Sequence, residues 1–199
     1  MLMRGIIISS SCFILLLLSC NQNSEFKKIG KQFDGRDSLI YKINPNSEIL
    51  YWKYIESYPN RTVREVGNKD LFNSYNFEEP EGGFYIECHP AFCFSYIVYI
   101  NKEGLNYITD EKSLQKFIGT IDNIEEAILI GKTLDLGIDS NDKKGGSYKK
   151  TQNGFDMYLL RYNGCPETYE SIQFTIDFNG NFKNESKGIY KKTGDCYIS

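Results

Sequence analysis

Apolar side chains recur along the chain at two spacings, and each spacing predicts a different kind of element. Alternation of apolar and polar positions, typical of a half-buried strand, is clearest in Thr62–Val66 and on both sides of Asn179-Gly180. Residues 48–58 fit both a helix and a strand, and their aromatic and isoleucine content favours a strand. Further strands are predicted over residues 38–43, 84–88, 94–100, 105–108, 147–151, 155–162, 169–178 and 181–190.

Recurrence of apolar residues at intervals of three and four predicts two helices, at about residues 110–118 and 123–135. Thr109 or Asp110 can cap the first helix, and Asp122 or Asn123 can cap the second. Residues 70–75 are predicted to form one further helical turn.

The order of these elements predicts an α+β protein. Asn179-Gly180 lies between two alternating segments, and both residues accept the positive φ angles that a tight hairpin turn requires. No internal repeat or second linker interrupts residues 36–199. We therefore expect a single α+β domain, with an antiparallel β-sheet built of hairpins and the two helices packed on one face.

The first twenty residues differ from the rest of the chain. Arg4 is their only charged residue, and residues 5–19 are dominated by Ile, Leu and Phe. An apolar stretch of this length is typical of a secretory signal and is too short to span a bilayer of about 30 Å as a helix. It ends in Leu17-Leu18-Ser19-Cys20.

This ending resembles the lipobox of bacterial lipoproteins, with an aliphatic residue, a small residue and then a cysteine at the cleavage point. The resemblance implies that residues 1–19 are a lipoprotein signal peptide. It also implies that Cys20 carries a diacylglyceryl group on its sulfur and an acyl chain such as palmitate on its new amine, and two or more chains hold a protein firmly at a membrane. Asn21 is not the aspartate that retains many lipoproteins in the inner membrane, so we expect a cell-envelope protein at the outer membrane. A plain secretory signal and a short membrane anchor are the alternatives.

Residues 20–35 are polar, with scattered charges and two glycines, and predict a lipidated flexible tether. Four cysteines remain beyond it, and an even number in an exported domain indicates two disulfides with three possible connectivities. Proximity in the chain favours Cys88–Cys93 and Cys165–Cys196.

Composition narrows the classes of partner. The chain has 23 Lys and Arg against 26 Asp and Glu, and removing the signal with Arg4 leaves a formal charge of −4. This mild acidity argues against a nucleic-acid partner, for which a basic face is expected. Aromatic residues make up 15% of the chain, which fits either packing within sheets or an exposed aromatic surface for a glycan or a protein.

Residues Cys88-His89-Pro90-Ala91-Phe92-Cys93 contain the only histidine of the chain. Adjacent side chains of an extended segment point to opposite sides, so a catalytic Cys88–His89 pair is disfavoured. A zinc site needs three or four ligands. A disulfide-stapled turn is the favoured interpretation, with metal binding and redox chemistry as alternatives.

Two acidic segments are further candidates. Asp139, Asn141 and Asp142 suggest a calcium loop, but the glycine and terminal glutamate of such loops are missing at the required spacing. Glu78, Glu79 and Glu81 form a cluster that favours a solvated surface over a ligand site. No cofactor or metal is therefore expected.

These patterns lead to three functional hypotheses. The first is a non-enzymatic binding module held at the membrane through lipid on Cys20, with a possible protein partner in the envelope. The second is an immunity protein or inhibitor of an exported toxin or enzyme, in which the Glu78–Glu81 carboxylates complement a basic site. The third is a carboxylate-based hydrolase, for which the sequence does not single out a pair of residues.

Overall fold

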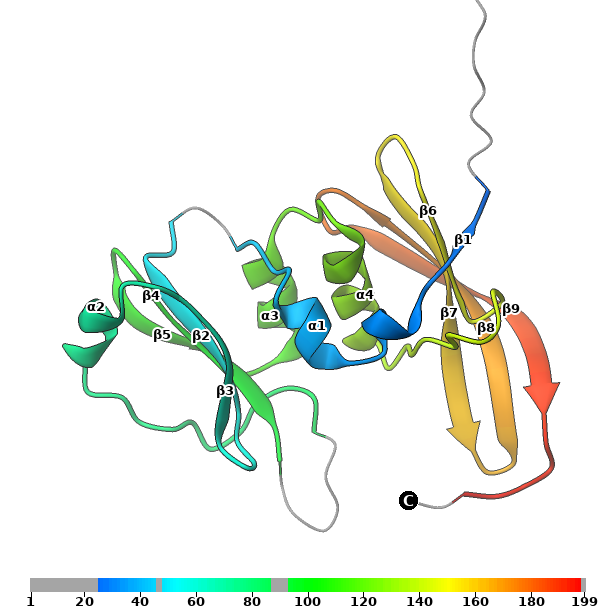
Figure 1. The fold of residues 1–199 in the computed structure, drawn as a ribbon, viewed down its shortest axis with the longest axis horizontal. Coiled ribbons are helices and arrows are strands. Elements are labelled where there is room, and N and C mark those ends of the chain that lie inside the picture. The colour runs from blue at the N-terminus through cyan, green and yellow to red at the C-terminus, as the bar shows by residue number, and fades with distance from the viewer. Residues whose placement is uncertain (1–24, 46–47, 87–92, 198–199) are drawn as a thin grey trace, which may run out of the picture.

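The computed structural model describes residues 25–45, 48–86 and 93–197. It contains two antiparallel sheets, of five and four strands, with a layer of helices between them (Figure 1). The α+β class is confirmed. The prediction of one sheet with helices on one face is corrected, because the strands of residues 51–108 form one sheet, the strands of residues 27–28 and 146–192 form another, and both sheets pack on the helical layer.

The five-stranded sheet has the order β1-β6-β7-β8-β9. The predicted hairpin at Asn179-Gly180 is confirmed between β8 and β9, and Gly180 has a φ of 81°, where a side chain would be strained. The strands are β1 (Lys27–Lys28), β6 (Gly146–Lys150), β7 (Gly154–Gly164), β8 (Glu167–Asp177) and β9 (Phe182–Lys192).

The four-stranded sheet has the order β3-β2-β4-β5. One face of this sheet packs on the helices, while Phe72 of the short helix α2 (Lys69–Asn73) and Phe77 cover the opposite face. The strands are β2 (Tyr51–Glu56), β3 (Arg61–Gly67), β4 (Ser95–Asn101) and β5 (Gly104–Ile108). The predicted strand over residues 84–88 is only an isolated bridge between Phe84 and Ser95, and residues 87–88 lie outside the described part.

The two predicted helices are confirmed as α3 (Glu111–Ile118) and α4 (Ile124–Lys132). The side chain of Asp110 accepts a hydrogen bond from the backbone N–H of Ser113, and that of Asn123 accepts one from Glu126, each at 2.9 Å. Both are N-caps, which satisfy backbone donors that the first turn leaves free.

The predicted strand over residues 38–43 is wrong. Residues Arg36–Ile40 form helix α1, which follows the short 3₁₀ helix Lys31–Phe33. Leu39 and Ile40 are both fully buried, whereas a strand would direct these neighbours to opposite faces. Helical geometry allows both to face the core beside α4, with which α1 is in contact.

The predicted tether is too long. Lys27 and Lys28 pair with Tyr148 and Ser147 of β6, and Ile29 is fully buried. The backbone N–H of Ile29 donates to the carbonyl of Gly146 at 2.8 Å. The folded part therefore begins near Lys27, because one buried isoleucine and a short strand attach this segment to the sheet.

One hydrophobic cluster connects the two sheets through the helices. Its buried members include Trp52 of β2, Leu114 of α3, Leu129 of α4 and Phe174 of β8. Within the described residues, no helix is long and apolar enough to cross a membrane.

Candidate functional site

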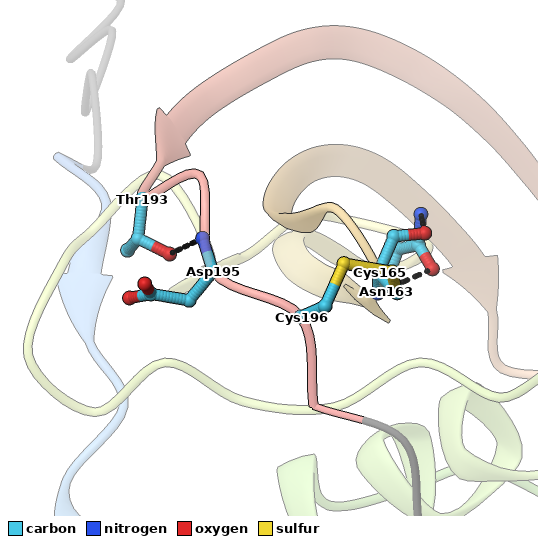
Figure 2. Close-up of a disulfide and its surroundings, with 5 residues drawn as sticks. All are labelled: Asn163, Cys165, Thr193, Asp195 and Cys196. Atoms are coloured by element: carbon cyan, nitrogen blue, oxygen red, sulfur yellow. Dashed lines mark hydrogen bonds between the residues drawn. A yellow bond between two sulfur atoms is a disulfide. The ribbon is translucent and has the colours of Figure 1, made fainter.

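The predicted disulfide between Cys165 and Cys196 is confirmed (Figure 2). It joins the β7–β8 turn to the segment that follows β9. Backbone hydrogen bonds of 2.7 Å support the same connection, from Glu167 N–H to the carbonyl of Asp195 and from Tyr197 N–H to that of Gly164. The C-terminal segment is thereby held against the end of the five-stranded sheet.

Replacing both cysteines of this bridge by serine is expected to lower the free energy of unfolding by about 2–4 kcal/mol, because the cross-link restricts the unfolded chain. Urea denaturation of the variant and of the oxidised protein measures the difference. A reductant should lower the free energy of unfolding of the parent by breaking this bridge. The Cys165→Ser/Cys196→Ser variant has no such bridge to lose, so its stability should not fall for this reason. Equal stability of the two proteins would contradict the prediction.

The other predicted cysteine pair is only partly described. Cys93 is buried and disulfide-bonded, whereas Cys88 and His89 lie outside the described residues. The predicted Cys88–Cys93 pairing and the predicted role of His89 therefore stay predictions.

The acidic loop before β6 has a structural role. The carboxylate of Asp139 accepts the backbone N–H of Asn141 at 2.9 Å and of Asp142 at 3.2 Å, and it also accepts the hydroxyl of Tyr190 at 3.0 Å. Asp142 accepts the backbone N–H of Lys144. Among the described residues, no group of three His, Cys, Asp or Glu side chains is arranged to hold a metal ion.

The clearest candidate for a binding surface is the outer face of the five-stranded sheet. Met157 and Leu159 of β7 are buried towards the helices, so the alternating Tyr158 and Tyr162 lie on the opposite face. We call this the tyrosine face. It is defined by Phe26, Tyr158, Tyr162, Tyr169, Ile189 and Tyr190.

Ring contacts order the tyrosine face. Tyr169 contacts Tyr162 with ring centroids 5.3 Å apart and Tyr190 at 6.3 Å, while Phe26 contacts Tyr158 at 4.8 Å. Tyr162 is 47% exposed and Ile189 is 60% exposed. Exposed aromatic and aliphatic side chains that are already packed against each other lose little side-chain freedom when a partner binds.

Glu167 fixes the tyrosines at one end of this face. Its carboxylate accepts the hydroxyl of Tyr169 at 2.8 Å and of Tyr162 at 3.4 Å, and it also accepts the hydroxyl of Thr193. The hydrogen bond from Thr193 is the main cause that lowers the pKa of Glu167, and the bond to Glu167 is the main cause that raises the pKa of Tyr169. An ionised carboxylate therefore orients two neutral phenols.

A hollow of about 520 Å³ lies on the tyrosine face. Tyr158, Ile189 and Tyr190 form much of its apolar lining, and Lys144 and Lys187 contribute to its rim. The arrangement can accept a side chain or a ring against its aromatic wall and offers ammonium groups to an anionic substituent.

Two other features compare less well as binding sites. A cleft of about 840 Å³ between α3 and the β8–β9 turn is lined by a mixture of polar and apolar groups, and none of its lining residues is aromatic.

Burial raises the pKa of Glu126 to about 7, a value that suits a general acid. Glu126 is nevertheless fully buried, and its two oxygens accept the backbone N–H groups of Asn44 and Asp122, so it is a structural residue.

Comparison with protein-family models, with curated proteins and with solved structures finds no match for this chain. The candidate site therefore depends on geometry alone. The aromatic content of the sequence allows an exposed aromatic surface as one alternative but does not identify its residues. Alternation in residues 155–162 was the available signal, although it does not show which side of the strand faces the helices.

Proposed function

We propose that the protein is a lipid-anchored binding module of the cell envelope, without catalysis of its own, and that the tyrosine face contacts its partner. The observation that carries the proposal is the mutually packed set of tyrosines on the outer face of the sheet, where Tyr162 and the aliphatic Ile189 are exposed and the other rings are half-buried. Aromatic residues are enriched at the energetically dominant positions of interfaces, because they bury a large area at small entropic cost. The lipobox at Cys20 supports the membrane anchor.

The Tyr162→Ala/Ile189→Asp variant is expected to lose partner binding by at least about tenfold, since truncating one energetically dominant interface residue costs about 2 kcal/mol or more. The chain from Asn21 onward, without the signal and without Cys20, serves as bait for envelope and secreted proteins, and affinity for the captured partner is then measured. The matched control is Tyr41→Ala/Leu50→Asp, which alters a tyrosine and an aliphatic residue of similar exposure outside the tyrosine face.

Equal loss in both variants, or none in the first, would show that the tyrosine face is not the interface. Mass spectrometry of the membrane-extracted protein tests the anchor separately. An unacylated Cys20 would contradict the anchor without affecting the test of the interface.

The inhibitor hypothesis has one specific observation in its favour. Glu78, Glu79 and Glu81 are exposed in the segment after α2. Helix α2 itself lies at the end of the molecule farthest from β1 (Figure 1). A toxin or enzyme with a basic active site is the partner that such a cluster would fit. If the captured partner is of this kind, Glu78→Gln/Glu79→Gln should weaken its binding, and the tyrosine-face variant should not.

A further inference from the structure

Lysines are concentrated where the chain enters the fold. Pairing of β1 with β6 brings together residues 25–33 and 142–150, which contain seven lysines and two carboxylates, Glu25 and Asp142. These two segments have a formal charge of +5 in a chain of −3. We call this region the basic edge, and its lysines are Lys27, Lys28, Lys31, Lys143, Lys144, Lys149 and Lys150.

The ammonium groups of this edge are largely available to a ligand. Lys27, Lys28 and Lys31 are exposed and form no ion pair with any described residue. Lys143 pairs with Glu25 at 3.3 Å, but both side chains are more than half exposed, and such pairs contribute little. Lys149 is half-buried and pairs with Asp156 at 3.2 Å, so it adds less to the free positive charge of this edge. Unpaired positive charge in a mildly acidic protein repels itself and therefore favours a partner of opposite charge.

Chain length places the basic edge next to the anchor. Cys20 and Glu25 are separated by five residues, which span at most about 18 Å when fully extended. The four-stranded sheet lies at the other end of the long axis (Figure 1). Residues 48–111, which include that sheet, have eleven acidic and five basic residues, a formal charge of −6. The charge therefore changes sign between the two ends of the molecule.

We propose that the basic edge docks on the anionic lipid headgroups of the membrane that holds the anchor. This proposal uses the lipid anchor of the proposed function to explain the location of the lysines. The anchored chain cannot move β1 far from the headgroups, and the negative surface potential attracts the basic edge while it repels the acidic end. The domain then stands with its four-stranded sheet directed away from the membrane.

The test measures binding of the chain from Asn21 onward, which includes every described element and lacks acyl chains, to vesicles by co-sedimentation. One set contains phosphatidylcholine alone and the other includes about 30% phosphatidylglycerol, which gives an anionic surface. We expect binding to the anionic vesicles only, and loss of binding when salt is raised. Lys27→Gln/Lys28→Gln/Lys31→Gln should weaken it by about a hundredfold, since each lysine near an anionic surface contributes about fivefold.

The matched control, Lys69→Gln/Lys102→Gln/Lys183→Gln, removes three exposed lysines outside the basic edge and should bind like the parent. None of the six residues lines the hollow on the tyrosine face. No preference for anionic vesicles, or equal loss in the two variants, would overturn the proposal. These outcomes are independent of whether Cys20 is acylated and of whether the tyrosine face binds a partner, so a failure here is distinguishable from a failure of the proposed function.

Discussion

Replacing Trp52 by alanine is expected to lower the free energy of unfolding by about 3–5 kcal/mol, which is the usual cost of deleting a buried aromatic ring. Trp52 is 2% exposed, and its ring meets that of Phe117 edge-on, with the centroids 5.5 Å apart. The guanidinium of Arg64 lies 4.9 Å from the same ring and donates to the carbonyl of Ile40. The side chain of Trp52 thus joins β2 to α3. It also positions Arg64, whose guanidinium binds the carbonyl of Ile40 at the C-terminal end of α1.

The change should be measured by urea denaturation followed by far-UV circular dichroism, because the variant lacks the only tryptophan of the chain. Trp52→Phe is the control, since a phenyl ring preserves an aromatic contact with Phe117 and leaves a smaller cavity. The loss of unfolding free energy in Trp52→Phe should be less than half the loss in Trp52→Ala. A loss below about 1 kcal/mol for alanine would mean that the site collapses around the cavity and that the two layers are joined elsewhere.

Stability is expected to fall as the pH rises through the titration of Glu126. Burial is the main cause that raises its pKa from 4.5 to about 7, and the hydrogen bonds from the backbone N–H groups of Asn44 and Asp122 oppose the rise. Between these two values the folded protein holds a proton that the unfolded chain has released. The raised pKa of Glu126 therefore contributes about 3 kcal/mol to the free energy of unfolding at low pH. This contribution is complete below about pH 4.5 and is lost as the pH passes 7.

The experiment compares the parent with Glu126→Gln at several pH values. Glutamine does not titrate, and it places an amide N–H₂ against one of the two backbone donors, so it is expected to destabilise the protein under acidic conditions by about 1–3 kcal/mol. The difference from the parent should shrink as the pH rises. Glu125→Gln removes the same charge one position earlier and should show no such trend. A difference that grows with pH would mean that the hydrogen bonds outweigh burial.

Local features of the fold could be predicted from the sequence. The caps Asp110 and Asn123, the hairpin at Asn179-Gly180 and the bridge Cys165–Cys196 each depend on the chemistry of a few neighbouring residues, and each is confirmed. Division into two sheets could not be predicted, because alternation shows that a segment is a strand but does not show which strands it joins.

Two short segments near the N-terminal end, β1 and α1, also could not be predicted from the sequence. Strand β1 has only two residues, too few for a pattern, and α1 is a five-residue helix whose apolar residues are too few to reveal a period. The sequence also does not identify the tyrosine face, for a related reason. Both sides of β7 carry large side chains, such as Met157 and Leu159 against Tyr158 and Leu160, so only the packing of α4 shows which side is outward.

The position of β1 has a mechanical consequence. If lipid on Cys20 holds the protein, any pull on the domain reaches the fold first through β1, which is joined to β6 by two residue pairs and the bond from Ile29 to Gly146. Strands β6 to β9, in contrast, are paired along up to eleven positions. Tension should therefore detach β1 from β6 while the rest of the sheet stays intact. The released residues would then lengthen the flexible linker between the membrane and the domain.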